Sequence, residues 1–159
     1  MKEGVSGYHE NLNNKVNKKI LFLCEKVLKT PTLKRVMGLG IGGSCIQEKR
    51  QRGQNPEQDD IDIDVDVFFT LLPNNRDMSK ICKQILGVFQ EGGYTLDIRY
   101  LIDVFGNHAV LNEKTPGCVP VEIAHDFSRE DIKKIYTEKH PRSTFIVRNK
   151  VWAKLFFLT

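Results

Sequence analysis

The most regular alternation of hydrophobic and polar positions in the chain lies between Asp60 and Phe68. Aspartate occupies every second position from Asp60 to Asp66, and isoleucine or valine lies between. Because successive side chains of a β-strand point to opposite faces of its sheet, this period of two predicts a strand with one apolar and one acidic face. Like charges on one strand face repel each other unless a cation offsets them, so the acidic face indicates a cation site.

Two segments place apolar residues three and four positions apart, which is the spacing of an amphipathic helix. The first runs from about residue 10 to residue 29 and should end before Pro31. The second should have Asp77 as its N-cap and should end at Gly92 and Gly93. The apolar positions of the two helices are Val16, Ile20, Leu23, Cys24 and Val27, and Ile81, Ile85, Val88 and Phe89.

The remaining segments predict four more strands and two more helices. A two-residue turn at Gly106-Asn107 would join two of the strands as a hairpin. A short helix should open at Ser128, and a last helix should begin near Val147 and run to Thr159 with its apolar face uncovered, as expected of a fragment or of a chain that lacks a helical C-terminal part. The four strands are Arg35–Ile41, Tyr94–Phe105, His108–Leu111 and Cys118–Ala124.

The composition fits one domain with a core. The chain has 159 residues and 40% apolar residues, so we expect a single domain over 1–159, with its core in about 31–145 and the start of a helical part in 146–159. The net charge of +4 is compatible with RNA or a triphosphate as partner, but many soluble proteins share it. The spacing of the four cysteines does not fit a zinc site. No apolar run approaches the length of a transmembrane helix and no leader is present, so we expect a cytoplasmic protein without membrane contact.

The acidic strand has the arrangement of a magnesium site. Asp60 and Asp62 are two positions apart, so their carboxylates point to the same face and can share a pair of metal ions. Mg²⁺ prefers oxygen ligands and is usually held by one or two carboxylates together with substrate phosphates. A third carboxylate from a neighbouring strand would complete the site. Glu122 has the apolar, acid, apolar setting of a strand, and Asp126 and Asp97 are the alternatives.

A glycine turn precedes the acidic strand. Gly42-Gly43-Ser44 follows a predicted strand, and fifteen residues separate Ser44 from Asp60. Glycine lets the backbone approach a phosphate, and a helix that starts at the serine would supply N–H donors. On its own this motif occurs in many loops, so its value comes from its place before the acidic strand.

Together these motifs resemble the signature of the polymerase-beta-like nucleotidyltransferase superfamily. The resemblance spans about residues 36–124 and consists of Gly42-Gly43-Ser44, the later Asp60-Ile61-Asp62-Ile63 and Val121-Glu122-Ile123. Within the superfamily, these motifs and Ala153-Lys154-Leu155 are most similar to the AbiEii-type nucleotidyltransferase toxins of abortive-infection and toxin–antitoxin systems.

The resemblance implies an α/β (α+β) nucleotidyltransferase fold, with a mixed, mostly antiparallel sheet flanked by helices. It implies transfer of a nucleoside monophosphate from a nucleoside triphosphate to RNA, protein or a small molecule, with two Mg²⁺ ions and an antitoxin protein as partner. Asp60 and Asp62 would ligate metal, and Glu122 would ligate the second ion and help to deprotonate the acceptor hydroxyl. The residues expected to bind the nucleotide are Gly42, Gly43, Ser44 and Lys154.

Three points stay open at this stage. Asp64 and Asp66 extend the acidic series beyond the usual pair, so the aspartates that bind metal are not settled by the pattern. A non-catalytic nucleotide- or RNA-binding module with the same fold, a calcium-binding protein and a solvated edge strand are alternatives. The basic loop segment with Lys49, Arg50 and Arg52 fits a solvated loop better than a site that steers RNA, and His108 and His125 fit structural roles.

Overall fold

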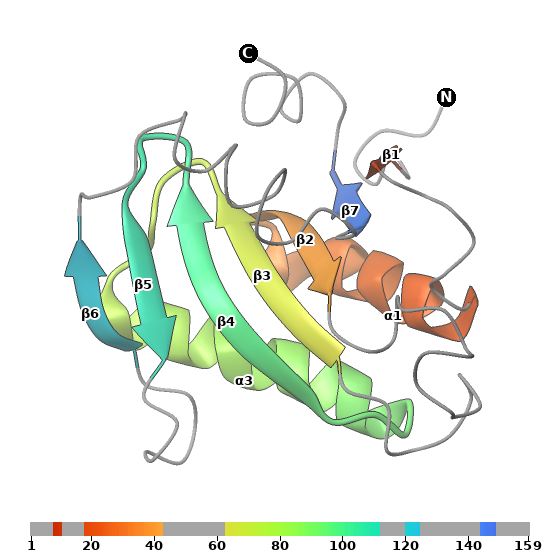
Figure 1. Cartoon of the computed structure of the whole chain (residues 1–159). Coiled ribbons are helices and arrows are strands. Elements are labelled where there is room, and N and C mark those ends of the chain that lie inside the picture. Colours follow the sequence, from red (N-terminus) through yellow and green to blue (C-terminus); the bar gives the residue numbers. More distant parts are fainter. Residues whose placement is uncertain (1–7, 11–17, 43–62, 112–119, 125–143, 149–159) are drawn as a thin grey trace.

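The computed structural model describes residues 8–10, 18–42, 63–111, 120–124 and 144–148 as an α+β fold. The seven strands of these segments form one mixed sheet in the order β1-β7-β2-β3-β4-β5-β6, and the two α-helices of these segments lie behind this sheet in Figure 1. The helices are α1 (Lys18–Lys29) and α3 (Asn75–Glu91), with a 3-10 turn, η1 (Pro31–Leu33), after the first. The strands are β1 (Tyr8–Glu10), β2 (Val36–Gly42), β3 (Ile63–Phe69), β4 (Leu96–Asp103), β5 (His108–Leu111), β6 (Pro120–Ala124) and β7 (Thr144–Val147).

The sheet is mostly antiparallel, as the sequence predicts. Among the described strands only β3 and β4 pair in parallel, and α3 is the crossover that connects them. A parallel pair requires such a crossover because the chain must return to the same end of the sheet. The arrow directions in Figure 1 therefore place the end of β2 and the starts of β3 and β4 on the same side of the sheet. We call this side, which is formed by strand ends and not by an outermost strand, an edge of the sheet.

The hydrophobic core lies between the sheet and the two helices. From β3 it receives the apolar residues of the alternating segment, and these are fully or almost fully buried. From β4 it receives Ile98 and Leu101, which are three positions apart yet pair with Val65 and Val67, two positions apart. A bulge in β4 absorbs the extra residue and keeps both side chains on the core face. The residues that β3 supplies are Ile63, Val65, Val67 and Phe69.

The helix boundaries match the predicted ones except at the starts. Helix α1 ends at Lys29, as Pro31 requires, but Glu10, where the predicted helix begins, belongs to strand β1. The N-cap of α3 is Asn74 and not Asp77, because the Asn74 side chain accepts a 2.8 Å hydrogen bond from the backbone N–H of Asp77. Asp77 occupies the first turn instead. Gly92 closes the helix as predicted.

The hairpin turn differs from the predicted two-residue turn at Gly106-Asn107. Strand β4 ends at Asp103 and β5 begins at His108, so four residues connect them. The fully buried Asp103 carboxylate organises this turn by accepting hydrogen bonds from the backbone N–H of Phe105 (2.9 Å) and from the backbone and side-chain N–H groups of Asn107 (3.0 and 2.8 Å). It also accepts one from the backbone N–H of Leu72, 3.1 Å away, and thereby ties the turn to the loop after β3.

The prediction of a helix that begins near Val147 is wrong at that residue, because Val147 lies in β7 and pairs with Gly38 of β2. Arg148 follows, and its guanidinium group donates to the main-chain carbonyls of Leu28, Leu33 and Val36. Burial lowers the pKa of this guanidinium from its ordinary value. The end of β7 is thereby fixed to α1, η1 and β2. The apolar positions after residue 148 lie outside the described residues.

Neither of the helices in the described segments has the length and apolar character needed to cross a membrane.

Candidate functional site

The last residue of β2 and the first described aspartate of β3 meet at one edge of the sheet. Strand β2 ends at Gly42, and Gly42 is the register partner of Asp64 near the start of the antiparallel strand β3. On its other side, Asp64 is the register partner of Asp97 near the start of β4. Gly43-Ser44 follows Gly42, and Asp60 and Asp62 precede β3; these four predicted site residues lie outside the described residues, as does Lys154.

Asp64 and Asp97 face the side of the sheet that is opposite the helices. The core residues of β3 are the odd-numbered ones, so the alternation turns Asp64 and Asp66 the other way. Register partners on parallel strands project to the same face, about 4.8 Å apart at the backbone. Asp64 is partly exposed and Asp97 is exposed. The edge therefore presents carboxylates from two adjacent strands.

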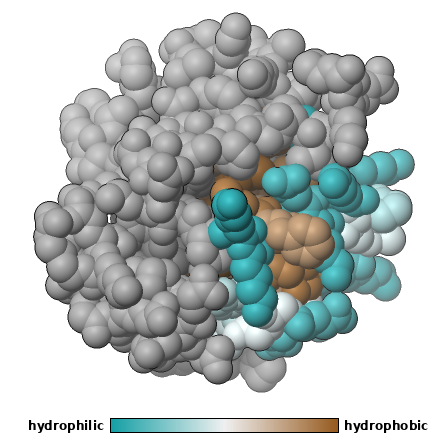
Figure 2. Space-filling view, turned by 90° about the vertical axis from the view of Figure 1, so that its right-hand side faces the viewer, coloured by the Kyte–Doolittle hydropathy of each residue, from teal (hydrophilic) through white to brown (hydrophobic). Residues whose placement is uncertain are grey.

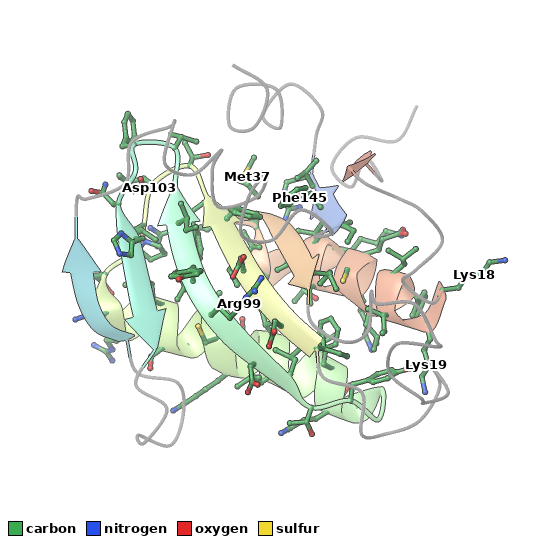
Figure 3. The ribbon with its side chains drawn as sticks, in the orientation of Figure 1. Lys18, Lys19, Met37, Arg99, Asp103 and Phe145 are labelled. Atoms are coloured by element: carbon green, nitrogen blue, oxygen red, sulfur yellow. The ribbon has the colours of Figure 1, made fainter. Side chains whose placement is uncertain are left out.

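Asp66 is the counter-ion of an arginine. Its two carboxylate oxygens accept hydrogen bonds from Nε and Nη2 of Arg99, at 3.2 and 3.1 Å. The Asp66 side chain is fully buried, and that of Arg99 is 19% exposed. Figure 3 shows Arg99 in the middle of the sheet, away from the end of β4 where Asp103 lies. The protein thus supplies its own cation for Asp66, and this carboxylate needs no metal ion to offset its charge.

Sequence reasoning missed Arg99, although a signal was present. Asp97, Ile98 and Arg99 repeat the polar, apolar, polar alternation of the acidic strand, and Arg99 carries the opposite charge. The two side chains meet because β3 and β4 are adjacent parallel strands, which the sequence does not specify.

Two aromatic rings cover the next part of the same face. Phe68 and Phe145 have ring centroids 5.9 Å apart and tilted planes. Between them lies Gly40 of β2, where an added Cβ would come within 3.2 Å of atoms of both rings. Gly40 therefore lets the two rings pack across the strand. The acidic part of the face is bounded on this side by apolar side chains.

Glu122 lies in β6, at the far side of the sheet from β2. It is the register partner of Val110 in β5, which in turn pairs with Tyr100 in β4. Three strand spacings thus separate its backbone from β3, which corresponds to about 14 Å. Asp97 and Asp126 are the alternatives to Glu122 as the third ligand. Asp97 lies on the strand next to β3, and Asp126 lies outside the described residues.

Another candidate group in the described segments is the side chain of His108. His108 is buried and lies edge-on to the ring of Tyr100, with the ring centroids 6.5 Å apart, which agrees with a structural role. The described segments contain no group of three or more histidine, cysteine or acidic residues placed to hold a metal ion.

Comparison of the chain with protein-family models, with curated proteins and with solved structures gave no match.

Proposed function

We propose that the protein is a metal-dependent nucleotidyltransferase whose site lies at the edge formed by the end of β2 and the start of β3. The observation that carries this proposal is the pairing of Gly42 with Asp64. Gly43-Ser44 directly follows Gly42 in the sequence, and Asp60-Ile61-Asp62 directly precedes β3, so both motifs adjoin the paired segments. A phosphate-binding turn beside a series of carboxylates is the arrangement that this chemistry needs.

The donor set fits magnesium. Asp64 and Asp97 offer hard carboxylate oxygens from neighbouring strands, and Asp60 and Asp62 would extend this set along the same face. Bound Mg²⁺ would offset the negative charge of the triphosphate and of the reacting phosphoryl group. We assign Asp60 and Asp62 as metal ligands and Asp97 as the third carboxylate, since it lies next to β3 and Glu122 does not.

The proposed reaction is an in-line displacement at the α-phosphorus of a nucleoside triphosphate. The acceptor hydroxyl oxygen forms a bond to this phosphorus, the bond to the β-phosphate oxygen breaks, and pyrophosphate leaves. A carboxylate of the site takes the hydroxyl proton. Gly42, Gly43 and Ser44 would hold the triphosphate through main-chain N–H groups and the serine hydroxyl, with Lys154 as a further phosphate ligand.

The role of such an enzyme as a toxin with an antitoxin partner is a further proposal, which follows from the resemblance to AbiEii-type proteins. A non-catalytic nucleotide- or RNA-binding module is the second candidate. The Asp66–Arg99 pair favours this second candidate, because the charge of one aspartate of the acidic strand is neutralised by an arginine of the protein itself.

Transfer of labelled nucleotide separates these candidates. The protein is incubated with each labelled nucleoside triphosphate, Mg²⁺ and total RNA, beside Asp60→Ala/Asp62→Ala and the control Asp77→Ala, which removes an acidic side chain from the start of α3. We expect label on macromolecule or released pyrophosphate with the wild type and the control, and none with the double variant. Triphosphate binding without transfer to any acceptor would instead support the binding module.

A further inference from the structure

The outer surface of the helical layer is strongly basic. From Lys18 to Arg35 and along α3, the described structure exposes nine lysine and arginine side chains. The same segments contain three acidic residues, and two of these lie within ion-pair distance of basic ones, Glu91 at 3.9 Å from Lys26 and Asp77 at 3.4 Å from Arg35. The nine cations are Lys18, Lys19, Lys26, Lys29, Lys34, Arg35, Arg76, Lys80 and Lys83.

An exposed phenylalanine lies among these lysines. Phe22 is 65% exposed, and the only other exposed residues of α1 are its four lysines. Lys18 and Lys26 lie one turn before and one turn after Phe22 on the same side of the helix, about 6 Å away along the axis. Figure 2, which views the α1 side of the molecule, shows an apolar patch bordered by hydrophilic residues.

This basic surface extends to the edge that carries the candidate site. The Lys19 ammonium lies 5.2 Å from the ring centroid of Tyr94, and Tyr94 precedes the start of β4 by two residues. Asp97 follows in the same strand. Lys18 and Lys19, labelled in Figure 3, therefore mark the end of α1 that is nearest to the acidic edge. A polyanion that lies along α1 would reach this edge from the helix side, and its terminus would have to turn around the starts of β3 and β4 to the face that carries Asp64 and Asp97.

We propose that the exposed side of α1, formed by Lys18, Lys19, Phe22, Lys26 and Lys29, binds single-stranded RNA and presents it to the site as the acceptor. Lysine side chains neutralise backbone phosphates, and the exposed ring stacks on a base; together these are the features of sequence-tolerant single-strand binding. An acidic protein segment would use the lysines but would have no need of a flat exposed ring between them. The role as acceptor site rests on the proposed function, whereas RNA binding itself does not.

Fluorescence anisotropy with a labelled 12-nucleotide single-stranded RNA, without Mg²⁺ or nucleotide, tests the proposal. We expect Phe22→Ala to weaken binding about 5- to 100-fold, which corresponds to the loss of one stacked base. The matched control is Phe105→Ala, because Phe105 is 70% exposed in the β4–β5 turn at the opposite edge of the sheet, and we expect it to bind as the wild type does. Lys18→Gln/Lys26→Gln/Lys29→Gln should lower the slope of log affinity against log salt by about 2.

Equal affinities of the wild type and Phe22→Ala, or no binding by the wild type, would overturn the proposal. Displacement of the RNA by polyglutamate at equal charge concentration, with no difference between the wild type and Phe22→Ala, would point to an acidic protein partner and would also overturn it. Circular dichroism of each variant checks that it is folded. Asp60→Ala/Asp62→Ala should bind the RNA normally, so a failure of nucleotidyl transfer and a failure of RNA binding are separate results.

Discussion

The guanidinium group of Arg99 donates through Nε and Nη2 to the two carboxylate oxygens of Asp66, and this carboxylate is fully buried. A paired contact of this kind fixes both position and charge. It joins β3 to β4 on the same face of the sheet as Asp64 and Asp97, two residues further along β3. Of the two described aspartates of β3, Asp66 is therefore neutralised by Arg99 inside the protein, and Asp64 lies nearer the start of the strand.

Removal of Arg99 should destabilise the fold strongly. Arg99→Met leaves the buried Asp66 charge without its cation, and we expect a loss of about 3–5 kcal/mol in the free energy of unfolding, measured with urea. Asp66→Leu/Arg99→Met removes both charges and should recover most of this loss. A double variant as unstable as the single one would contradict the view that the pair acts by mutual neutralisation.

A side chain at Gly40 should disturb the buried aromatic pair on the face of the sheet opposite the helices. Gly40→Ala places a Cβ within 3.2 Å of ring atoms of Phe68 and Phe145, so the rings must move, and we expect a loss of about 1–3 kcal/mol. Gly87→Ala is the matched control. No atom lies within 4 Å of an added Cβ at Gly87, which lies in α3, so this change should stabilise the protein by about 0.5–1 kcal/mol. Thermal unfolding of both variants distinguishes them by the sign of the shift in Tm.

The two candidates for the N-cap of α3 can be compared directly. Asn74→Ala removes the oxygen that accepts from the N–H of Asp77 and should cost about 1 kcal/mol. Asp77→Ala removes a first-turn carboxylate and a surface ion pair with Arg35, so its cost should be about 0.3–1 kcal/mol and should fall with added salt. Urea unfolding at low and high salt tests this. A larger loss for Asp77→Ala at high salt would contradict the cap assignment.

The turn between β4 and β5 should depend on Asp103. Asp103→Ala leaves four N–H groups without their acceptor, and we expect a loss of about 1.5–3 kcal/mol. Hydrogen exchange should show faster exchange at the amides of Leu72, Phe105 and Asn107. Unchanged exchange at these amides would show that the carboxylate does not hold the turn.

The elements that the sequence predicts best are those with long, regular patterns. The alternation in β3 and the helical spacing of α1 and α3 depend on local periodicity, which the sequence displays directly. Strand β7 has four residues and forms by pairing with β2 and β1, which are distant in the sequence, so local patterns gave no sign of it. The bulge in β4 likewise depends on the partner strand.

The same distinction applies to the candidate site. Its acidic residues and its glycines were visible in the sequence, but the choice between Asp97 and Glu122 depends on strand order. The Asp66–Arg99 contact joins residues that are 33 positions apart through a parallel register, which no local pattern specifies. Asp103 could not be recognised as a turn residue because the connection between β4 and β5 has four residues, two more than the predicted turn.

The most direct test of the proposed site is calorimetry of triphosphate binding with and without Mg²⁺. We predict that the wild type binds a nucleoside triphosphate only with Mg²⁺, that Asp60→Ala/Asp62→Ala abolishes binding, and that Asp97→Asn weakens it about tenfold or more while Glu122→Gln leaves it within about twofold. Binding that is independent of Mg²⁺, or that persists in the double aspartate variant, would contradict a metal-dependent nucleotide site at this edge of the sheet.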